Sequence, residues 1–275
     1  MIHETILTAL RCPKCGAAMT FDGHSLFCGG ERRHCYDAAA SGYVNLAPEH
    51  RAGGDSKEAV RARTAFLSRG YYAPVAEAIE ALAARYAAPG LFCDAGCGEG
   101  YYTGRLAAIA PTCGFDLSRA AVEAGAKRAR REGLQAFYAV AGLYNLPLMD
   151  RSVDFLLNHF APCAEDEFAR VLKPGGVLVV GAAGEDHLLG LKRAIYDTPV
   201  RNEARADLPR GMALIERRTV REIIHLSRPA DIAALFAMTP YYYRTSEADR
   251  AKLNALETLD TEIEVELSVY RRQDA

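Results

Sequence analysis

Residues 92–100 read Phe-Cys-Asp-Ala-Gly-Cys-Gly-Glu-Gly, and this stretch decides the fold. An apolar run that begins at Leu91 leads into an acidic residue and then into glycines at alternate positions. Glycine tolerates positive φ and carries no side chain, so a strand that ends in such a turn can bring bare backbone against a ligand. A helical pattern follows at once. The spacing Asp-x-Gly-x-Gly-x-Gly is denser than the G-x-G-x-x-G of dinucleotide-binding proteins.

This denser spacing resembles motif I of S-adenosylmethionine (SAM)-dependent methyltransferases. SAM has no pyrophosphate, so the glycines would make room for its methionine and ribose parts. The resemblance implies that Asp94, Gly96, Gly98, Gly100 and Tyr101 bind the cofactor. The alternative is a tight strand-to-helix turn without a ligand, which would use the same glycines.

A second acidic residue strengthens the cofactor interpretation. Residues 113–118 read as a strand that ends in Asp116. This acid follows the glycine loop by about 20 residues, where an acid grips ribose hydroxyls in nucleotide-binding α/β folds. Asp116 and Leu117 are therefore predicted to contact the cofactor. Asp116 could also cap the helix that continues from Ala120, and both roles are compatible.

The rest of the pattern predicts an α/β fold with a parallel sheet covered on both faces. Further strands are expected at 136–141, 152–160 and 177–181, and the segment RVLKPGG at 170–176 reads as a helix end and a turn. Two final strands, within 213–226 and at 262–270, should pair antiparallel. Helices are expected at 57–68, from Ala73, at 186–196 and at 229–238. We predict a class I SAM-dependent methyltransferase, Rossmann-like with a seven-stranded sheet.

Composition narrows the functional class. The chain has 275 residues, eight cysteines and a net charge of −2, which does not indicate nucleic-acid binding. Basic patches are local, and each could simply be solvated surface: Lys14, Arg32 and Arg33, and then Lys57, Arg61 and Arg63. No apolar run reaches the ~18 residues of a membrane span, and the N-terminus lacks a secretion signal. We expect a cytoplasmic protein with reduced thiols.

The first cysteines form a metal-binding pattern. Cys12 and Cys15 make a knuckle, Cys28 follows, and then come His34 and Cys35. Four Cys/His ligands suit a structural zinc ion, and the metal would supply folding energy to a segment too short for its own core. A redox Cys-x-x-Cys is the alternative, but it would need a thioredoxin-like context. From spacing, either His34 or Cys35 could be the fourth ligand. Cys93, Cys97 and Cys113 are expected to be buried apolar residues.

An ordered set of short segments resembles one family. The knuckle is followed by GYVNL (42–46), GDS (54–56), an Ala-Arg-x-Ala-Phe-Leu helix (62–67), CGEGYYT (97–103), APC (161–163) and MTP (238–240). Over roughly residues 9–245 the chain is similar to the RlmA-type 23S ribosomal RNA (guanine-N1)-methyltransferases. The family implies His34 as the fourth zinc ligand. It also implies a homodimer and, as target, a guanine in a 23S rRNA hairpin loop. One branch confers resistance to macrolides.

The resemblance also divides the chain. Residues 1–46 would be a zinc-binding RNA-recognition module, 47–88 a helical linker that closes over the cofactor, and 89–275 the methyltransferase domain. Methyl transfer from a sulfonium mainly needs alignment of nucleophile, methyl and sulfur. Asn158, at the end of the fourth strand, is predicted to orient the base edge. Alternation points His159 to the other side of the strand, where a structural role is expected.

The acceptor base must leave its stack, and flipped bases stack on aromatic side chains. Phe160 and the tyrosines at 241–243 are candidates, although each tyrosine could equally be packing surface. Arg244 could contact phosphate. The general base is not identified by the sequence.

Three other functions compete. Cys163 follows the fourth strand where cytosine-C5 methyltransferases keep a nucleophile, but no Lys or Arg adjoins it in sequence to lower its pKa. A small-molecule methyltransferase would share the fold but would not need a zinc module. A cofactor-binding RNA adaptor that is not an enzyme would not need the complete set of cofactor motifs.

Overall fold

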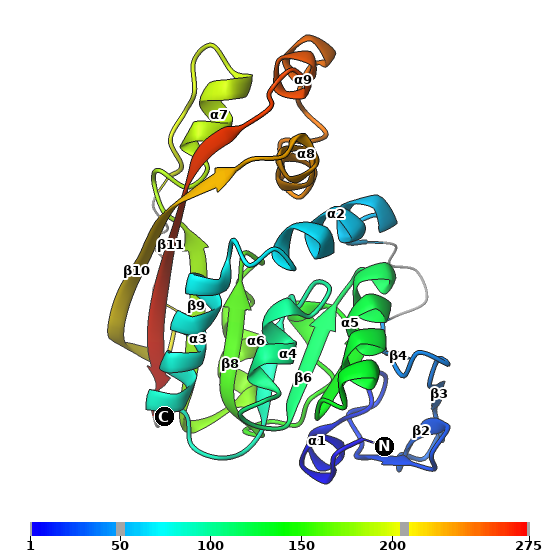
Figure 1. Ribbon diagram of the computed structural model, residues 1–275. Helices are drawn as coiled ribbons and strands as arrows, with labels where there is room; N and C mark the ends of the chain where they lie inside the picture. The colour runs from blue at the N-terminus through cyan, green and yellow to red at the C-terminus, as the bar shows by residue number, and fades with distance from the viewer. Residues whose placement is uncertain (1, 48–52, 204–208, 274–275) are drawn as a thin grey trace.

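The computed structural model describes residues 2–47, 53–203 and 209–273, and its centre is one large sheet (Figure 1). The central strands are parallel, and the last two strands, β10 and β11, pair antiparallel, as predicted. Strand β11 also runs antiparallel to β9. In spatial order the strands are β10 (Met212–Leu226), β11 (Leu259–Arg272), β9 (Leu172–Ala183), β8 (Val153–His159), β5 (Phe92–Ala95), β6 (Thr112–Asp116), β7 (Ala136–Val140) and β4 (Val44–Asn45).

Within the described residues the sheet has eight strands, so the predicted count of seven is wrong. The additional strand is β4, which comes from the GYVNL segment and pairs parallel with Ala139 and Val140 of β7. A strand of two residues is too short to show alternation in sequence. A smaller difference concerns β9, which begins at Leu172 directly after helix α6 (Glu165–Val171) and includes the Lys-Pro-Gly-Gly segment predicted as a turn.

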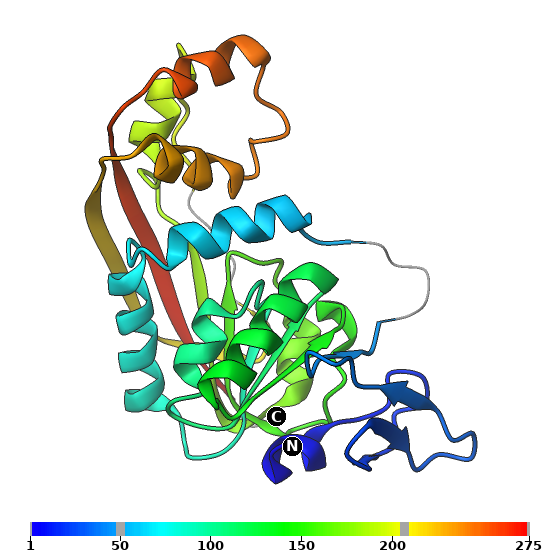
Figure 2. The same ribbon diagram turned by 45° about the vertical axis from the view of Figure 1, so that its right-hand side comes forward.

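Strand alternation sends successive side chains to two different cores. On one face, Phe155 and Leu157 of β8 join the cluster under α3 (Ala73–Tyr86) and near α4 (Tyr101–Leu106). On the other face, Leu156 joins a cluster with Phe168 and Val171 of α6. Helix α5 (Arg119–Glu132) lies beside α4 and packs on β6 and β7, so that α3, α4 and α5 cover one face (Figure 2). The sheet is therefore covered on both faces, as predicted.

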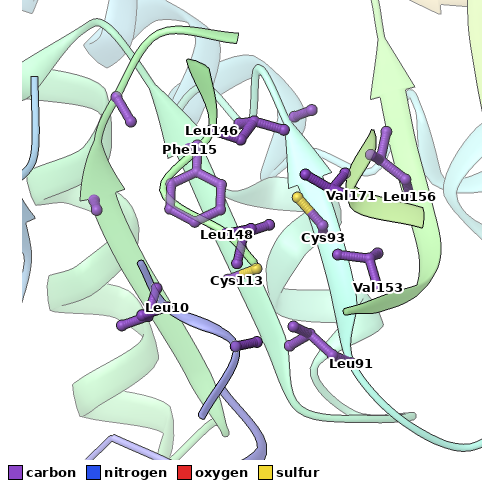
Figure 3. Close-up of a cluster of buried hydrophobic side chains, with 14 of the residues drawn as sticks. Leu10, Leu91, Cys93, Cys113, Phe115, Leu146, Leu148, Val153, Leu156 and Val171 are labelled. Atoms are coloured by element: carbon purple, nitrogen blue, oxygen red, sulfur yellow. The ribbon is translucent and has the colours of Figure 1, made fainter. Parts of the chain in front are cut away.

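The N-terminal segment folds as a small ribbon against the sheet. It contains α1 (Glu4–Ala9) and a three-stranded sheet of β1 (Met19–Phe21), β2 (Ser25–Cys28) and β3 (Cys35–Asp37). Leu10 packs in the same cluster as Phe115 and Cys113 of β6 (Figure 3), and the Arg11 amide donates to the Pro147 carbonyl oxygen at 3.1 Å. The ribbon shares its core with the sheet, and the predicted boundary at residue 46 remains a prediction.

Four helices lie at the carboxyl end of the parallel strands. Helix α2 (Lys57–Leu67) crosses above the strand ends, and α8 (Pro229–Ala237) packs on it (Figures 1 and 2). Helix α7 (Leu189–Ile195) starts later than predicted, because Leu188 before it has φ +58°. Helix α9 (Glu247–Asn254) follows α8. No helix in the described ranges is long and apolar enough to cross a membrane.

Candidate functional site

The glycine loop after β5 requires its glycines. Gly96, Gly98 and Gly100 have φ of +87°, +53° and +78°, in the left-handed region that favours glycine. A Cβ on Gly96 would lie 2.5 Å from Cβ of Ala161, and one on Gly100 would lie 2.6 Å from Cε1 of the buried Tyr138. The loop therefore passes closely between neighbouring elements and presents bare backbone at the strand ends.

Asp116 holds the glycine loop from the neighbouring strand. Its Oδ2 accepts a hydrogen bond from the Gly98 amide at 3.0 Å, and its Oδ1 accepts one from the Ser118 amide at 2.7 Å. Ser118, rather than Asp116, caps α5, because its Oγ accepts from the Ala121 amide at 3.2 Å. Each carboxylate oxygen of Asp116 keeps a further lone pair that can accept from a ribose hydroxyl. Leu117 follows and faces Gly53 across the site.

Two more acids lie in or under the loop. Asp94 is buried and accepts a hydrogen bond from Thr103 Oγ1 at 2.6 Å, and burial raises its pKa to about 7. Glu99 is buried as well, and burial raises its pKa. Its Oε2 accepts from the Tyr101 amide at 3.2 Å, at the start of α4. Sequence reasoning did not select Glu99, although it stands inside the motif. The Tyr101 ring packs edge-on against Tyr102.

Asn158 ends β8 next to this loop and has a fixed amide orientation. Its Nδ2 donates to the carbonyl oxygens of Ala95 and Pro162, both at 3.2 Å, which uses both amide hydrogens. Among the described residues, the buried Oδ1 has no hydrogen-bond partner. A buried oxygen of this kind needs an explanation, and a ligand donor supplies one.

His159 is the last residue of β8, and Phe160 follows it. The buried His159 ring lies against Gly181 of β9 and packs edge-on with Tyr102, and burial lowers its pKa to about 3. The His159 side chain therefore points to the opposite side of β8 from Asn158, as alternation predicts. Phe160 has φ +52°, unusual for a non-glycine residue, and 47% of its surface is exposed. Its ring is tilted against the rings of His159 and His187, at centroid distances of 4.2 and 5.3 Å.

These residues fit SAM. The loop glycines leave backbone open at the strand ends, and Asp116 has lone pairs for ribose. The structure thus brings the predicted cofactor residues of β5, β6 and their loops next to Asn158 and Phe160, the two residues predicted to position the base.

The second candidate site is a thiol–imidazole cluster in the ribbon. The Sγ atoms of Cys12, Cys15 and Cys28 and a ring nitrogen of His34 all lie within 4.8 Å of one another. His34 Nδ1 is 3.5 Å from Cys12 Sγ and 3.3 Å from Cys28 Sγ, and the Sγ atoms of Cys15 and Cys28 are 3.7 Å apart. Tetrahedral zinc with ordinary bond lengths needs about 3.8 Å between sulfurs and about 3.6 Å between sulfur and nitrogen. The residues therefore fit zinc.

Cys35 stays outside this cluster. Its side chain is exposed and its Sγ lies 3.6 Å from Oδ1 of Asp37. Cys93, Cys97 and Cys113 are buried, as expected of small apolar residues. Cys163 and Glu266 both line a cavity of about 20 Å³.

The other predicted RNA-contacting residues belong to two parts of the fold, the segment after α8 and the N-terminal ribbon. Tyr241 and Tyr242 are half-buried and pack edge-on against Tyr196 and Phe236, so packing accounts for them. Tyr243 is 68% exposed. In the ribbon, the Arg33 guanidinium lies 4.3 Å from the Phe27 ring centroid.

Comparison with known proteins agrees with both sites. A family model described as a methyltransferase domain matches residues 92–176, and one described as "RlmA, N-terminal" matches residues 10–52. A 23S rRNA (guanine(748)-N(1))-methyltransferase of Streptomyces fradiae is 34% identical over 77% of this chain and 76% of its own length. A putative 23S rRNA (guanine-N(1)-)-methyltransferase of Micromonospora griseorubida is 33% identical over 98% of this chain and 99% of its own.

A putative enzyme of the same description from Bacillus subtilis is 28% identical over 94% of this chain and 95% of its own length. The relatives from Streptomyces fradiae and Micromonospora griseorubida each share about a third of the aligned residues with this chain, and the second match spans 98% of the chain. This chain therefore belongs to the RlmA-type 23S rRNA (guanine-N1)-methyltransferase family.

Proposed function

We propose that this protein transfers the methyl group of SAM to N1 of a guanine in a hairpin loop of 23S rRNA. The observation that carries this proposal is the end-to-end match to the Micromonospora griseorubida relative, which spans ribbon, SAM loop and C-terminal strands together. The zinc ribbon also argues against a metabolite as acceptor, because a small molecule needs no such appendage.

Asn158 can orient the acceptor base. Bound SAM supplies an activated methyl group, and the protein must present guanine N1 to it. Because both amide hydrogens of Asn158 are used by Ala95 and Pro162, Oδ1 can only accept a hydrogen bond. The exocyclic amine on the Watson–Crick edge of guanine can donate to this oxygen and leave N1 open to the methyl group. As the N1–methyl bond forms, the bond between methyl and sulfur breaks and N1 releases its proton.

Phe160 offers the stacking surface for a flipped base. Its backbone amide donates to the Gly181 carbonyl oxygen at 2.9 Å, which holds the residue at positive φ with an exposed ring. Strained backbone of this kind costs roughly 1–3 kcal/mol and occurs preferentially at functional sites. A base stacked on this ring would lie beside the end of β8, next to Asn158.

In the ribbon, we propose zinc ligands Cys12, Cys15, Cys28 and His34, with Cys35 excluded. We assign RNA recognition to the ribbon as well, and the positive charge of Lys14, Arg32 and Arg33 supports this assignment. The homodimer that the family implies, the resistance to macrolides that one of its branches confers, and the cytoplasmic location expected from the sequence remain predictions.

The test uses zinc-loaded protein, labelled SAM and protein-free 23S rRNA from a strain that lacks the enzyme. Label should enter the RNA, and mass spectrometry should place it on N1 of one guanine. The control RNA carries adenine at that position and should stay unlabelled. Label on another base, or on a metabolite but not on RNA, would refute the assignment.

Cytosine-C5 methylation through Cys163 makes a different prediction. That chemistry forms a covalent adduct between the thiolate and the base, so Cys163→Ala would abolish turnover. Under the guanine assignment, Cys163→Ala retains most of the activity, and no RNA–protein adduct forms in the wild type.

A further inference from the structure

The cradle that would hold SAM is unusually acidic. Asp94, Glu99 and Asp116 line or support the glycine loop, and Asp55 joins them from the segment before α2, since its charge raises the pKa of Asp116. SAM carries two positive groups, the sulfonium and the ammonium, which such a cradle attracts. It also carries one carboxylate, which the same acids repel. Binding of that carboxylate calls for a cation on the cradle.

Arg63 is placed to be this cation. The sequence offered it only as part of a basic patch with Lys57 and Arg61 on one helix, but only 24% of its side chain is exposed. Its Nη1 lies 3.4 Å from the position that a Cβ on Gly98 would occupy. Its charge opposes the rise that burial causes in the pKa of Glu99 in the loop and of Asp116 at the end of β6.

The segment before α2 holds Arg63 in this position. Gly54 has φ +87° and packs closely against Ser118, because a Cβ on Gly54 would lie 2.5 Å from the Ser118 amide nitrogen. Ser118 Oγ donates to the Asp55 carbonyl oxygen at 2.8 Å, and the Asp55 carboxylate pairs with Arg63 Nη1. Ser56 then caps α2, with its Oγ accepting from the Ala59 amide at 3.2 Å. The GDS segment thus fixes the guanidinium over the loop.

Arg128 also approaches this loop, and it is already bound to Glu99. Its Nη2 donates to the Glu99 carbonyl oxygen at 2.6 Å, and its Nη1 lies 3.8 Å from Glu99 Oε1. It approaches from α5, whereas Arg63 approaches from α2 above the strand ends. A guanidinium has five N–H donors, arranged in a fork that matches a carboxylate. Asp55 pairs with Nη1 of Arg63, so the other N–H groups of Arg63 can bind a second carboxylate.

We propose that Arg63 binds the carboxylate of the methionine part of SAM. The proposal rests on the cofactor of the function proposed above and is independent of its acceptor. It makes Arg63 a cofactor-binding residue and gives the GDS segment the role of holding it.

The test compares two ligands that differ by this one group. Isothermal calorimetry measures the affinity of the zinc-loaded protein for SAM and for decarboxylated SAM, without RNA. Arg63→Met should weaken SAM binding by roughly 10- to 100-fold, the range for lost hydrogen bonds to a charged group. The affinity for decarboxylated SAM should stay the same. Arg63→Lys should bind SAM with intermediate affinity, because a point charge lacks the fork.

The matched control is Arg61→Met, because Arg61 is exposed on the same helix. It should change neither affinity, and thermal unfolding checks that all variants fold. An equal loss of affinity for both ligands in Arg63→Met would overturn the proposal, because Arg63 would then act through the GDS segment alone. Unchanged SAM affinity with weakened RNA binding would also overturn it and would make Arg63 a phosphate contact. Since no acceptor is present, a wrong RNA assignment leaves this result unaffected.

Discussion

Gly100 offers a stringent test of how the glycine loop is built. In Gly100→Ala, the new Cβ would lie 2.6 Å from Cε1 of Tyr138, on a residue with φ +78°. Left-handed backbone costs a non-glycine residue roughly 1–2 kcal/mol. Overpacking adds typically about 1–3 kcal/mol, because the Tyr138 ring is buried and cannot swing into solvent. We expect Gly100→Ala to lower the free energy of unfolding by roughly 2–5 kcal/mol.

Gly133 provides the matched control. It also has positive φ, +65°, but a Cβ there would meet nothing within 4 Å. Gly133→Ala should therefore cost only the backbone term of roughly 1–2 kcal/mol. Urea unfolding, followed by circular dichroism, measures both variants, and calorimetry measures their SAM affinity. Gly100→Ala should also lose SAM binding, whereas Gly133→Ala should keep it. Equal destabilisation of the two variants would refute the close approach of Tyr138.

Three further predictions concern other parts of the molecule. His34→Ala should lose bound zinc by elemental analysis and unfold at lower temperature, whereas Cys35→Ser should keep both; zinc loss in Cys35→Ser alone would reverse the ligand assignment. Asn158→Ala should lower kcat/KM for RNA by roughly 10-fold or more with little change in SAM affinity, because a buried contact to the base is lost; an unchanged kcat/KM would remove Asn158 from the acceptor site. Burial raises the pKa of Asp94 to about 7, so between pH 4 and 7 the folded state holds a proton that the unfolded state releases. The stability of the wild type relative to Asp94→Asn should therefore fall as pH rises from 4 to 7. Parallel curves of stability against pH for the two proteins would contradict this prediction.

The sequence alone determined the features that depend on local chemistry. The loop at 92–100 could be predicted because positive φ at alternate positions is a property of glycine itself. Asp116 could be placed because the carboxyl ends of adjacent parallel strands meet at one edge of the sheet. The zinc knuckle could be predicted because Cys12 and Cys15 are close in sequence and so must be close in space. The opposite directions of the Asn158 and His159 side chains could be predicted as well, because successive side chains of a strand point to opposite faces.

Only the tertiary structure decided the features that join distant segments. Strand β4 exists because Val44 and Asn45 meet β7, more than ninety positions away, and two residues carry no pattern of their own. Arg63 looks like surface charge in sequence, and only the docking of the GDS segment on Ser118 turns it toward the glycine loop. His34 and Cys35 are equally placed by spacing. The direction in which each side chain leaves β3 and its preceding turn brings His34 to the thiols and leaves Cys35 exposed, because neighbouring residues of extended chain point to opposite sides.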